Sequence, residues 1–489
     1  MALVAGVDSS TQSCKVVVVD SSTGQTVRTG KASHPDGTEI HPSFWWEALL
    51  AAVHDAGGLA DVAAVAIAGQ QHGMVLLDSA GQVIRPALLW NDTRSAPSAA
   101  DLVAEVGAAD LAARCGSVPV ASFTITKVRW VRDNEPDNAT RVAAVALPHD
   151  WLSWRLRGYG PASESPLGPD LEQLTTDRSD ASGTGYWSPH TGGYDLGLFE
   201  LALGRPAREA DPAAGSPTGA IVLPRVAAPD VSAGTVHGSL FPGMPDGVHV
   251  GAGAGDNAGG ALGLGAVAGD VVVSVGTSGT VYAVTGQPGS DSTGTIAGFA
   301  DASGAFLPIA VTLNAARILS SVATLLNVTF DELADLAMAA QPGSAGVVLV
   351  PYFEGERTPN LPDAKASFHG LSIASTTREN FARASIEGML CGLAGGLEAI
   401  TASGVAVQRL LLIGGAVQNP AVQAVAGQVF DVPVVIPAPG EYVARGAAVQ
   451  AAWLLSGSRP DWSLETIASP PAHHHPGILA QYKEAARLA

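Results

Sequence analysis

An acidic residue within a run of glycine is the first place where this sequence could do chemistry. Asp256 and Asn257 stand in "GAGAGDNAGG" (251–260), whose other positions are all Gly or Ala. A carboxylate in a glycine-lined pocket can accept a proton from a substrate hydroxyl, because the bare backbone leaves room for the reactants. Glycine also serves tight structural turns, and Asp256 could instead cap the helix that "NAGGALGLGAV" predicts. The two interpretations are compatible.

Two turns made of small hydroxyl residues form a second group of candidates. "DSSTQSC" begins at Asp8, and "GTSGT" spans Gly276–Thr280. Successive backbone N–H groups and hydroxyls in such turns can hold phosphate oxygens, and a carboxylate can face the metal that accompanies them. Taken alone, the first turn also fits a structural Asx or Ser/Thr turn. Because one turn occurs in each half of the chain, we favour opposite walls of a nucleotide cleft.

Uncharged polar and aromatic residues follow two further predicted strands. Gln71 and His72 lie in "GQQHG", and Trp90 lies in "LLWNDTRS". Amide and imidazole groups suit a neutral polyhydroxylated ligand, and an indole ring packs well against sugar C–H groups. The structural alternatives are a histidine in an ordinary turn and a core tryptophan.

A glycine pair near the C-terminus offers another approach to the backbone. In "RLLLIGGAVQNPAVQAVAGQVF", Gly414 and Gly415 follow a predicted strand, and Asn419 precedes Pro420 at the predicted start of a helix. Glycine at the end of a strand lets a flat ligand approach the main chain. Asn at a helix cap with Pro just inside is a typical helix start. A tight strand-to-helix turn is the equally weighted alternative.

The elements that must position these residues occur twice. In the first half we expect strands over 3–7, 15–20 and 62–69 and a helix over 43–57. In the second half "VVVSV", "GTSGT" and "VYAV" repeat the strand–turn–strand order from about residue 270. We therefore predict a duplicated α/β architecture, with the first unit ending near residue 247. The Pro-, Gly- and Ala-rich stretch 204–247, which contains "AIVLP", is predicted to connect the units.

Composition narrows the class of protein. The 489 residues are 47% hydrophobic and 15% charged, with a formal net charge of −19. Such a chain suits a compact protein of two or three domains, and its charge argues against nucleic-acid and membrane-surface partners. The three cysteines have no disulfide or zinc spacing, and we see no targeting segment or membrane-spanning run. We expect a soluble, cytoplasmic protein.

Together these residues resemble the FGGY family of carbohydrate kinases. "SFTITKVRWVRDN" (122–134) and "ASFHGLSIASTTRENFARASIEG" (366–388) are similar to the two signatures of that family, in the expected order. The resemblance implies two actin-like, ribonuclease H-like domains, 1–247 and 248–489, around a cleft for ATP, Mg²⁺ and a sugar. "PYFEGERTPN" and "SDASGT" also look familial, but we assign them no chemical role.

The resemblance also implies roles for individual residues. Asp256 is expected to be the catalytic base, and Asp8 is expected to support Mg²⁺-bound ATP. The remaining expected contacts are Gln71, His72, Trp90 and Asn257 with the sugar; Ser10, Thr11, Gly276, Thr277 and Ser278 with the phosphates; and Gly414, Gly415 and Asn419 with the adenosine. Ser10 is a departure, because many members have Gly there, and its phosphate contact stays open.

Within the family, "GQQHG" is similar to the members that act on xylulose. Members that act on glycerol are expected to have an Arg-Glu pair at the positions of Gln71 and His72. We therefore expect ATP-dependent phosphorylation of D-xylulose, in an enzyme that could form a homodimer as relatives do. The alternatives are a kinase for another ketose or polyol, a sugar-binding regulator, and an actin-like ATPase.

Overall fold

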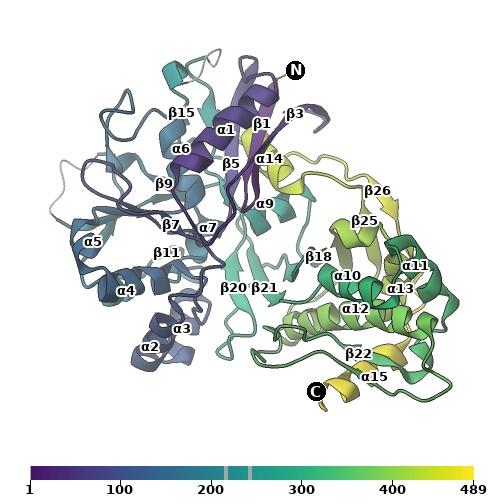
Figure 1. Ribbon diagram of the computed structural model, residues 1–489. Coiled ribbons are helices and arrows are strands. Elements are labelled where there is room, and N and C mark those ends of the chain that lie inside the picture. Colours follow the sequence, from purple (N-terminus) through teal and green to yellow (C-terminus); the bar gives the residue numbers. More distant parts are fainter. Residues whose placement is uncertain (1, 214–218, 241–244, 489) are drawn as a thin grey trace.

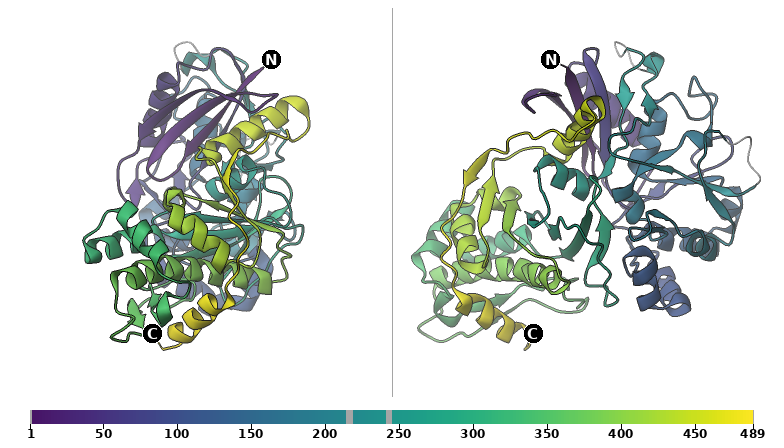
Figure 2. Two further views of the ribbon diagram at one scale, coloured as in Figure 1. Left: turned by 90° about the vertical axis from the view of Figure 1, so that its right-hand side faces the viewer. Right: turned by 180° about the vertical axis from the view of Figure 1, so that it is seen from behind.

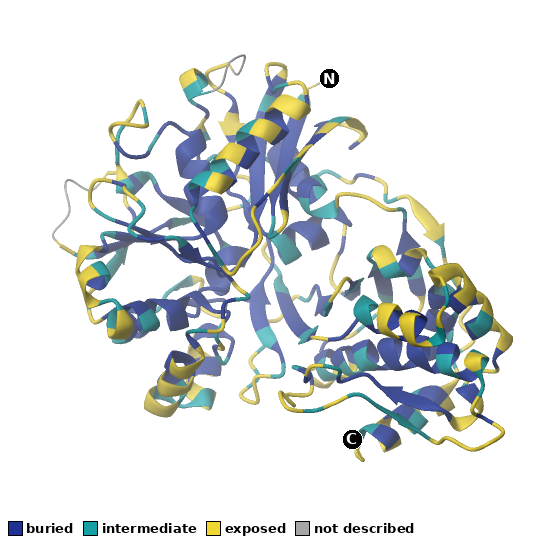
Figure 3. Ribbon diagram, in the orientation of Figure 1, coloured by how far each residue is buried: buried dark blue, intermediate teal, exposed yellow. Residues whose placement is uncertain are grey.

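Two seven-stranded sheets dominate the computed structural model, which describes residues 2–213, 219–240 and 245–488. One sheet lies in the half that contains the purple N-terminal strands, and the other runs from teal strands at the centre into the green and yellow half (Figure 1). Strand β1 and the last helix, α15, lie at opposite ends of the molecule, as the views of Figure 2 also show. Figure 3 shows that the central strands of both sheets are buried, while the outward faces of several helices are exposed.

The first sheet has the strand order β15-β16-β5-β1-β2-β3, and β17 also pairs with β5. β1 pairs antiparallel with β2 and parallel with β5. Apolar, often β-branched residues fill these central strands, which helices cover. The strands are β1 (Leu3–Ser9), β2 (Ser13–Asp20), β3 (Thr26–Ser33), β5 (Val62–Gly69), β15 (Gly234–Thr235), β16 (His249–Val250) and β17 (Ala254–Gly255).

The second sheet, β20-β21-β19-β18-β24-β25-β26, repeats this pattern. β18 pairs antiparallel with β19 and parallel with β24, as β1 does with β2 and β5. The order β21-β19-β18-β24-β25 therefore matches β3-β2-β1-β5-β16, which confirms the predicted duplication. The strands are β18 (Asp270–Val275), β19 (Gly279–Ala283), β20 (Ala297–Ala300), β21 (Phe306–Thr312), β24 (Arg409–Ile413), β25 (Val434–Pro437) and β26 (Thr466–Ala468).

Helices α9 and α14 pack against each other and join the two halves. α9 (Asp256–Gly263) follows β17 directly, while α14 (Tyr442–Ser456) comes from the end of the chain and packs on β1 and β5. The approach is close, because a Cβ on Gly6 would lie 1.9 Å from the carbonyl oxygen of Ala444. Late residues of the chain thus complete the core around the first sheet (Figure 1).

The remaining helices cover the sheets or form the periphery. Those of eight or more residues are α1 (Ser43–Asp55), α2 (Ala96–Val106), α3 (Ala108–Cys115), α4 (Thr124–Asn134), α6 (Pro148–Leu156), α8 (Leu196–Leu203), α10 (Ala316–Leu326), α11 (Phe330–Ala339), α12 (Arg378–Ala402), α13 (Pro420–Val429) and α15 (Pro476–Ala486). Two shorter ones are α5 (Pro136–Arg141) and α7 (Arg178–Ser182). Among the described residues, no helix is both long and apolar enough to cross a membrane.

Smaller sheets brace the first half and one loop of the second. A four-stranded sheet has the order β12-β13-β8-β6, and four two-stranded sheets accompany it. The strands are β4 (Glu39–Ile40), β6 (Val75–Leu77), β7 (Ala87–Leu88), β8 (Ala144–Ala146), β9 (Thr175–Asp177), β10 (Trp187–Ser188), β11 (Gly193–Tyr194), β12 (Ala207–Glu209), β13 (Ile221–Leu223), β14 (Arg225–Ala227), β22 (Val348–Val350) and β23 (Ser367–His369).

Most predicted elements are present, with shifted ends. The strand expected over 3–7 continues to Ser9, because Asp8 and Ser9 pair with Lys15 and Cys14 of β2. The predicted connection 204–247 contains β12 to β15 in its described parts; 214–218 and 241–244 lie outside the described residues. β16 and β17 follow residue 247 but pair with β5. The division of the chain near residue 247 stays a prediction.

Candidate active site

Two cavities meet between the two halves of the molecule. The first has a volume of about 340 Å³ and the second about 730 Å³. Asp256, Asn257 and Ser274 line both of them. Side chains of the "GQQHG" turn also line the first cavity. Residues near the start of the chain and of the "IGG" turn after β24 line the second. A ligand in one cavity would therefore meet a ligand in the other at Asp256.

The first cavity contains the residues predicted to contact a sugar. Gln71, His72 and Trp90 all line it, together with Thr11. Trp90 is 40% exposed, which excludes the core-tryptophan alternative, and its indole N–H donates to Thr11 Oγ1 at 2.8 Å. The phenyl ring of Phe299 closes the cavity from the second half, with its centroid 5.6 Å from that of His72. The cavity thus combines aromatic walls with uncharged polar groups, as sugar sites do.

His72 is held in an uncommon backbone conformation that points its ring at the cavity. Its φ of 68° lies in the left-handed region, which residues with side chains rarely adopt. Burial lowers the pKa of His72 to about 3, so the imidazole is neutral. Its Nδ1 lies 2.6 Å from the carbonyl oxygen of Gly183, which can only accept a hydrogen bond. Nδ1 therefore carries the proton, and Nε2 is left as an acceptor for a ligand hydroxyl.

Lys127, which belongs to the first family-like signature, stabilises the turn that contains His72. Its ammonium group is fully buried at the start of α4 and donates to the carbonyl oxygens of His72 at 2.8 Å and Ser122 at 2.6 Å. Thr124 Oγ1 donates to the same His72 carbonyl at 3.3 Å. Burial lowers the pKa of Lys127 to about 7. The conformation of His72 thus depends on α4.

Asp256 is the first residue of α9 and lies where the cavities meet. Its Oδ1 accepts the backbone N–H of Asn257 at 2.8 Å and the Asn257 amide at 3.0 Å. That amide also donates to Gln71 Oε1 at 3.1 Å. Among the described residues, no other side chain donates a hydrogen bond to Oδ2, which is left for a ligand. Burial, and then the charges of Asp8 and Asp180, raise the pKa of Asp256 to about 7.

The glycines before Asp256 are required by neighbouring side chains. A Cβ on Gly253 would lie 2.3 Å from Cδ2 of His149, and one on Gly255 would lie 2.8 Å from Cγ of Gln71. Gly253 also has a φ of 90°, which favours glycine. The bare backbone here makes room for the protein's own residues, so the structural interpretation of these two glycines is correct. Asp256 still faces the cavities.

The second cavity contains the acidic residue of the first turn. Asp8 is buried at the end of β1, and burial raises its pKa. One of its oxygens accepts the hydroxyl of Ser10, and the other lies 3.7 Å from Lys15 Nζ. Lys15 in turn contacts Glu441 at 2.6 Å. Ser10 therefore fixes the Asp8 carboxylate, a role that glycine could not have.

The other predicted nucleotide contacts divide into two groups. Gly276, Thr277 and Ser278 form the turn between β18 and β19 and line the first cavity, while Gly414 and Gly415 line the second. Asn419 lines neither cavity. Its side-chain oxygen accepts the backbone N–H of Ala421 at 2.9 Å, and its amide donates to Phe330 O. The predicted helix cap at Asn419 is confirmed, and its contact with adenosine stays a prediction.

Comparison with known proteins agrees with this arrangement. Residues 3–263 match the N-terminal domain model of the FGGY family of carbohydrate kinases, and 271–455 match its C-terminal domain model. The chain is 46% identical to the xylulose kinase of Streptomyces coelicolor over 93% of this chain and 88% of that protein. It is 44% identical to the xylulose kinase of Streptomyces rubiginosus, over 96% and 92%. The crystal structure of xylulose kinase from Bifidobacterium adolescentis superposes with a TM-score of 0.90, at 46% identity over 99% of both chains.

The chain belongs to the FGGY family of carbohydrate kinases. The predicted fold class, two actin-like domains around a cleft, is thereby confirmed. This chain is therefore an ATP-dependent carbohydrate kinase, which rules out the alternatives of a sugar-binding regulator and an actin-like ATPase.

Several residues of this FGGY kinase site were not predicted. Arg357 lines the first cavity, and among the described residues no partner binds its guanidinium group. Burial lowers its pKa. Its loop is fixed by Glu356, which accepts the backbone N–H groups of Leu313 at 2.6 Å and Arg357 at 2.8 Å. Phe299, Lys15 and Ser274 are further examples. The signal for Arg357 was "PYFEGERTPN", whose motif was visible but whose place in the fold was not.

Proposed function

We propose that this kinase transfers the γ-phosphoryl group of ATP to the C5 hydroxyl of D-xylulose, giving D-xylulose 5-phosphate and ADP. One observation carries the proposal: Asp256, a carboxylate with a raised pKa, lines both cavities at their junction. A sugar in the first cavity and a nucleotide in the second would meet beside it. The names and high identity of the relatives support xylulose as the sugar.

In this proposal Asp256 is the general base. Both hydrogen bonds from Asn257 go to Oδ1, so Oδ2 accepts the proton of the attacking hydroxyl. A pKa of about 7 matches the operating pH of a cytoplasmic enzyme, where a base is most effective. As the hydroxyl oxygen forms its bond to phosphorus, the bond to the ADP oxygen breaks on the opposite side and the proton passes to Asp256.

The groups that position the sugar include both hydrogen-bond donors and hydrogen-bond acceptors. His72 Nε2 accepts from a hydroxyl, the amide of Gln71 can donate or accept, and Arg357 supplies donors only. A ketose differs from its alditol by a carbonyl oxygen, which only accepts. We place that carbonyl end near Arg357 and the C5 end near Asp256. The ring of Trp90 then covers the carbon chain.

The phosphates lie along the uncharged turns. Thr277, Ser278 and Thr11 line the first cavity, where the phosphate end of the nucleotide would enter past Asp256, and their backbone N–H groups and hydroxyls can hold phosphate oxygens. Asp8 fits a Mg²⁺ ion, because hard divalent cations prefer carboxylate oxygens and this side chain lines the second cavity. When bound with ATP, the ion offsets charge on the phosphates. Gly414 and Gly415 leave space for the adenosine.

A coupled assay of ADP release tests the proposal. The purified protein is supplied with ATP, Mg²⁺ and each of D-xylulose, ribulose, xylitol, arabinitol and glycerol. We expect the highest kcat/KM with D-xylulose and little ADP release without sugar. A clear preference for another sugar would replace xylulose but keep the kinase. Equal ADP release with and without every sugar would contradict the role of the first cavity.

A further inference from the structure

We propose that α7, with its flanking residues Asp177 and Gly183, fixes the position of Asp256 relative to His72, and that Ser179 is the positioning residue for Asp256. The segment overlaps "SDASGT", which the sequence marked without a role. The inference rests on the proposed function of Asp256, and its test separates the two.

The segment holds both sides of the site through direct hydrogen bonds. Ser179 Oγ accepts the backbone N–H of Gly255 at 3.0 Å, one residue before Asp256. Gly183 O accepts from the His72 ring at 2.6 Å. These contacts come from the beginning and the end of one short helical turn. One short element therefore contacts both the sugar-binding His72 and the residue that precedes the base Asp256.

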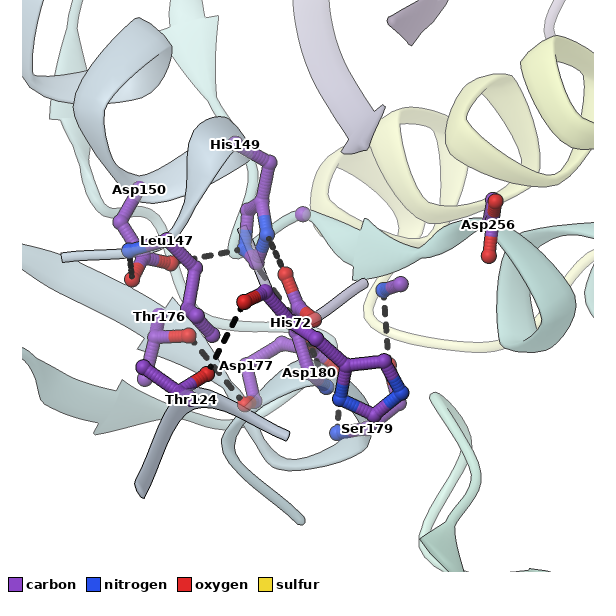
Figure 4. A network of polar contacts seen from close by, with 12 residues as sticks. His72, Thr124, Leu147, His149, Asp150, Thr176, Asp177, Ser179, Asp180 and Asp256 are labelled. Atoms are coloured by element: carbon purple, nitrogen blue, oxygen red, sulfur yellow. Dashed lines mark hydrogen bonds and ion pairs between the residues drawn. The ribbon is translucent and has the colours of Figure 1, made fainter. Parts of the chain in front are cut away.

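The segment is itself anchored by a buried cluster of charges. Asp177 caps α7 by accepting the backbone N–H groups of Ser179 at 2.8 Å and Asp180 at 3.0 Å. Asp180 contacts His149 Nδ1 at 2.7 Å, and His149 Nε2 lies 3.2 Å from Asp150 (Figure 4). Burial opposes a charge on His149, but the three carboxylates outweigh it and raise its pKa to about 9.

Such a cluster suits positioning more than stability. Fully buried ion pairs often add little net stability, yet they tolerate few arrangements, because any unpaired member is very costly. The cluster ties α6, which carries His149 and Asp150, to α7. It is also the only group of three or more potential metal ligands found close together among the described residues. Both ring nitrogens of His149 already contact carboxylates, Nδ1 that of Asp180 and Nε2 that of Asp150, so we assign the cluster a structural role. Asp180 Oδ1 has no hydrogen-bond partner among the described residues.

The backbone before Asp256 is pressed against this cluster from the other side. A Cβ on Gly253 would collide with His149, so this stretch can approach the cluster only because it lacks side chains. Asp256 begins α9, and Figure 4 draws it apart from the network, with no dashed line between them. Asp180 also contributes to the raised pKa of Asp256. Displacing α7 would therefore move the base as well as change its environment.

The test is a comparison of Ser179→Ala with a matched control, Ser385→Ala. Both hydroxyls are fully buried in helices, but Ser385 donates to Ala382 O within α12 and has no contact with the site. Ser179→Ala leaves the Gly255 N–H without its acceptor. We expect its kcat to fall by about tenfold to a hundredfold, the loss typical of a misplaced catalytic group, while the sugar KM stays within about twofold. The control should lose comparable thermal stability and keep its kcat.

A double variant shows whether Ser179 acts through Asp256. With Asp256→Asn in the background, Ser179→Ala should lower the residual kcat by less than about twofold, because residues acting as a unit are not additive. Full additivity, or equal kcat losses in Ser179→Ala and Ser385→Ala, would overturn the inference. An Asp256→Asn variant with normal kcat would instead overturn the proposed function.

Discussion

In the first half, β1 and β2 pair so that Asp8 stands opposite Lys15, whereas in the second half β18 and β19 pair so that Ser274 stands opposite Thr280. Each pair is the last but one before the turn. The first hairpin therefore brings a buried carboxylate and an ammonium group to the second cavity, and the other brings only the uncharged side chains of Ser274 and Tyr282 there.

The strands beside these hairpins differ in the same way. β5 ends at Gly69 and leads to the side chains of Gln71 and His72, while β24 ends at Ile413 and leads to Gly414 and Gly415. At these two strand ends, one copy of the fold thus supplies side-chain ligands and the other supplies open backbone. Two sheets of the same topology can therefore contribute different groups to one site, with Asp256 where the two cavities meet.

Removing the junction residue should have the largest effect. We expect Asp256→Asn to lower kcat by at least about 10²-fold, as loss of a positioned general base does. Asparagine keeps the shape of the side chain, so sugar binding should remain. Single-turnover kinetics would measure the first and isothermal titration with D-xylulose the second. Near-normal turnover would remove Asp256 from the mechanism.

The unequal hairpins can be compared directly. Asp8→Asn should lower kcat by about a hundredfold, the loss typical of removing a group that stabilises charge in the transition state. Ser274→Ala, at the corresponding position, should cost only about threefold, because a neutral hydrogen bond contributes little net free energy. Steady-state kinetics at several Mg²⁺ concentrations would measure both. Equal losses would mean that the halves share the charge-handling role.

Much of this division between the two halves could be predicted from the sequence, because it depends on short motifs of neighbouring residues. The strands around Asp8 and the "GTSGT" turn, the "GQQHG" turn and the cap at Asn419 each depend on neighbours within a few residues. The same short-range patterns located Asp256 in its glycine stretch. Motifs of this kind can be recognised in the sequence because their residues are neighbours both in the chain and in the folded protein.

The contacts that no pattern revealed join residues far apart. Lys15 meets Glu441 across 426 positions of the chain, and Arg357 reaches the first cavity from a loop without periodicity. The purpose of Gly253 was ambiguous for the same reason, since His149, which crowds it, is distant in sequence. Such contacts follow from the topology of the two sheets, and especially from α14 packing on the first one.

The pH dependence of activity should follow Asp256. Its pKa of about 7 implies that kcat/KM rises with pH and levels off above neutrality. One unit below the pKa, about one-tenth of the base is deprotonated, so activity should be about tenfold below the plateau. A rate profile from pH 5.5 to 9 would measure this. A profile flat through neutrality would contradict the raised pKa.

The same raised pKa predicts a cost in stability. In the unfolded chain Asp256 ionises near the ordinary value of 3.8, so the burial penalty grows as the pH rises from there to about 7. Asp256→Asn should therefore raise the melting temperature of the ligand-free protein, and more at pH 8 than at pH 5. Differential scanning calorimetry at both values would show it. A difference independent of pH would mean that the carboxylate is well solvated.

Arg357 tests whether the second half also contributes to the sugar. Arg357→Gln should raise the KM for D-xylulose by about tenfold, since hydrogen bonds from charged groups contribute about 1.5–3 kcal/mol. Arg317→Gln, on the neighbouring helix α10, is a control because Arg317 contacts Glu354 and Asn314 outside the cavity. If Arg357 meets the carbonyl end, the KM for xylitol should change little. Equal changes for ketose and alditol would move Arg357 to another part of the sugar.

Substitutions in the glycine pair should have the smallest effects on activity. They also separate loss of space for the nucleotide from loss of protein stability. A Cβ on Gly415 would meet no atom within 4 Å, whereas one on Gly414, which has a φ of 114°, would lie 2.3 Å from Val275 O. Gly415→Ala should therefore leave the melting temperature unchanged and raise the KM for ATP about threefold, because a methyl group in the second cavity displaces the nucleotide by a fraction of an ångström. Gly414→Ala should lower the melting temperature instead. If Gly415→Ala left the KM for ATP unchanged, the open backbone after β24 would not be where the adenosine lies, and the division between a ligand-bearing and an open half would need another explanation.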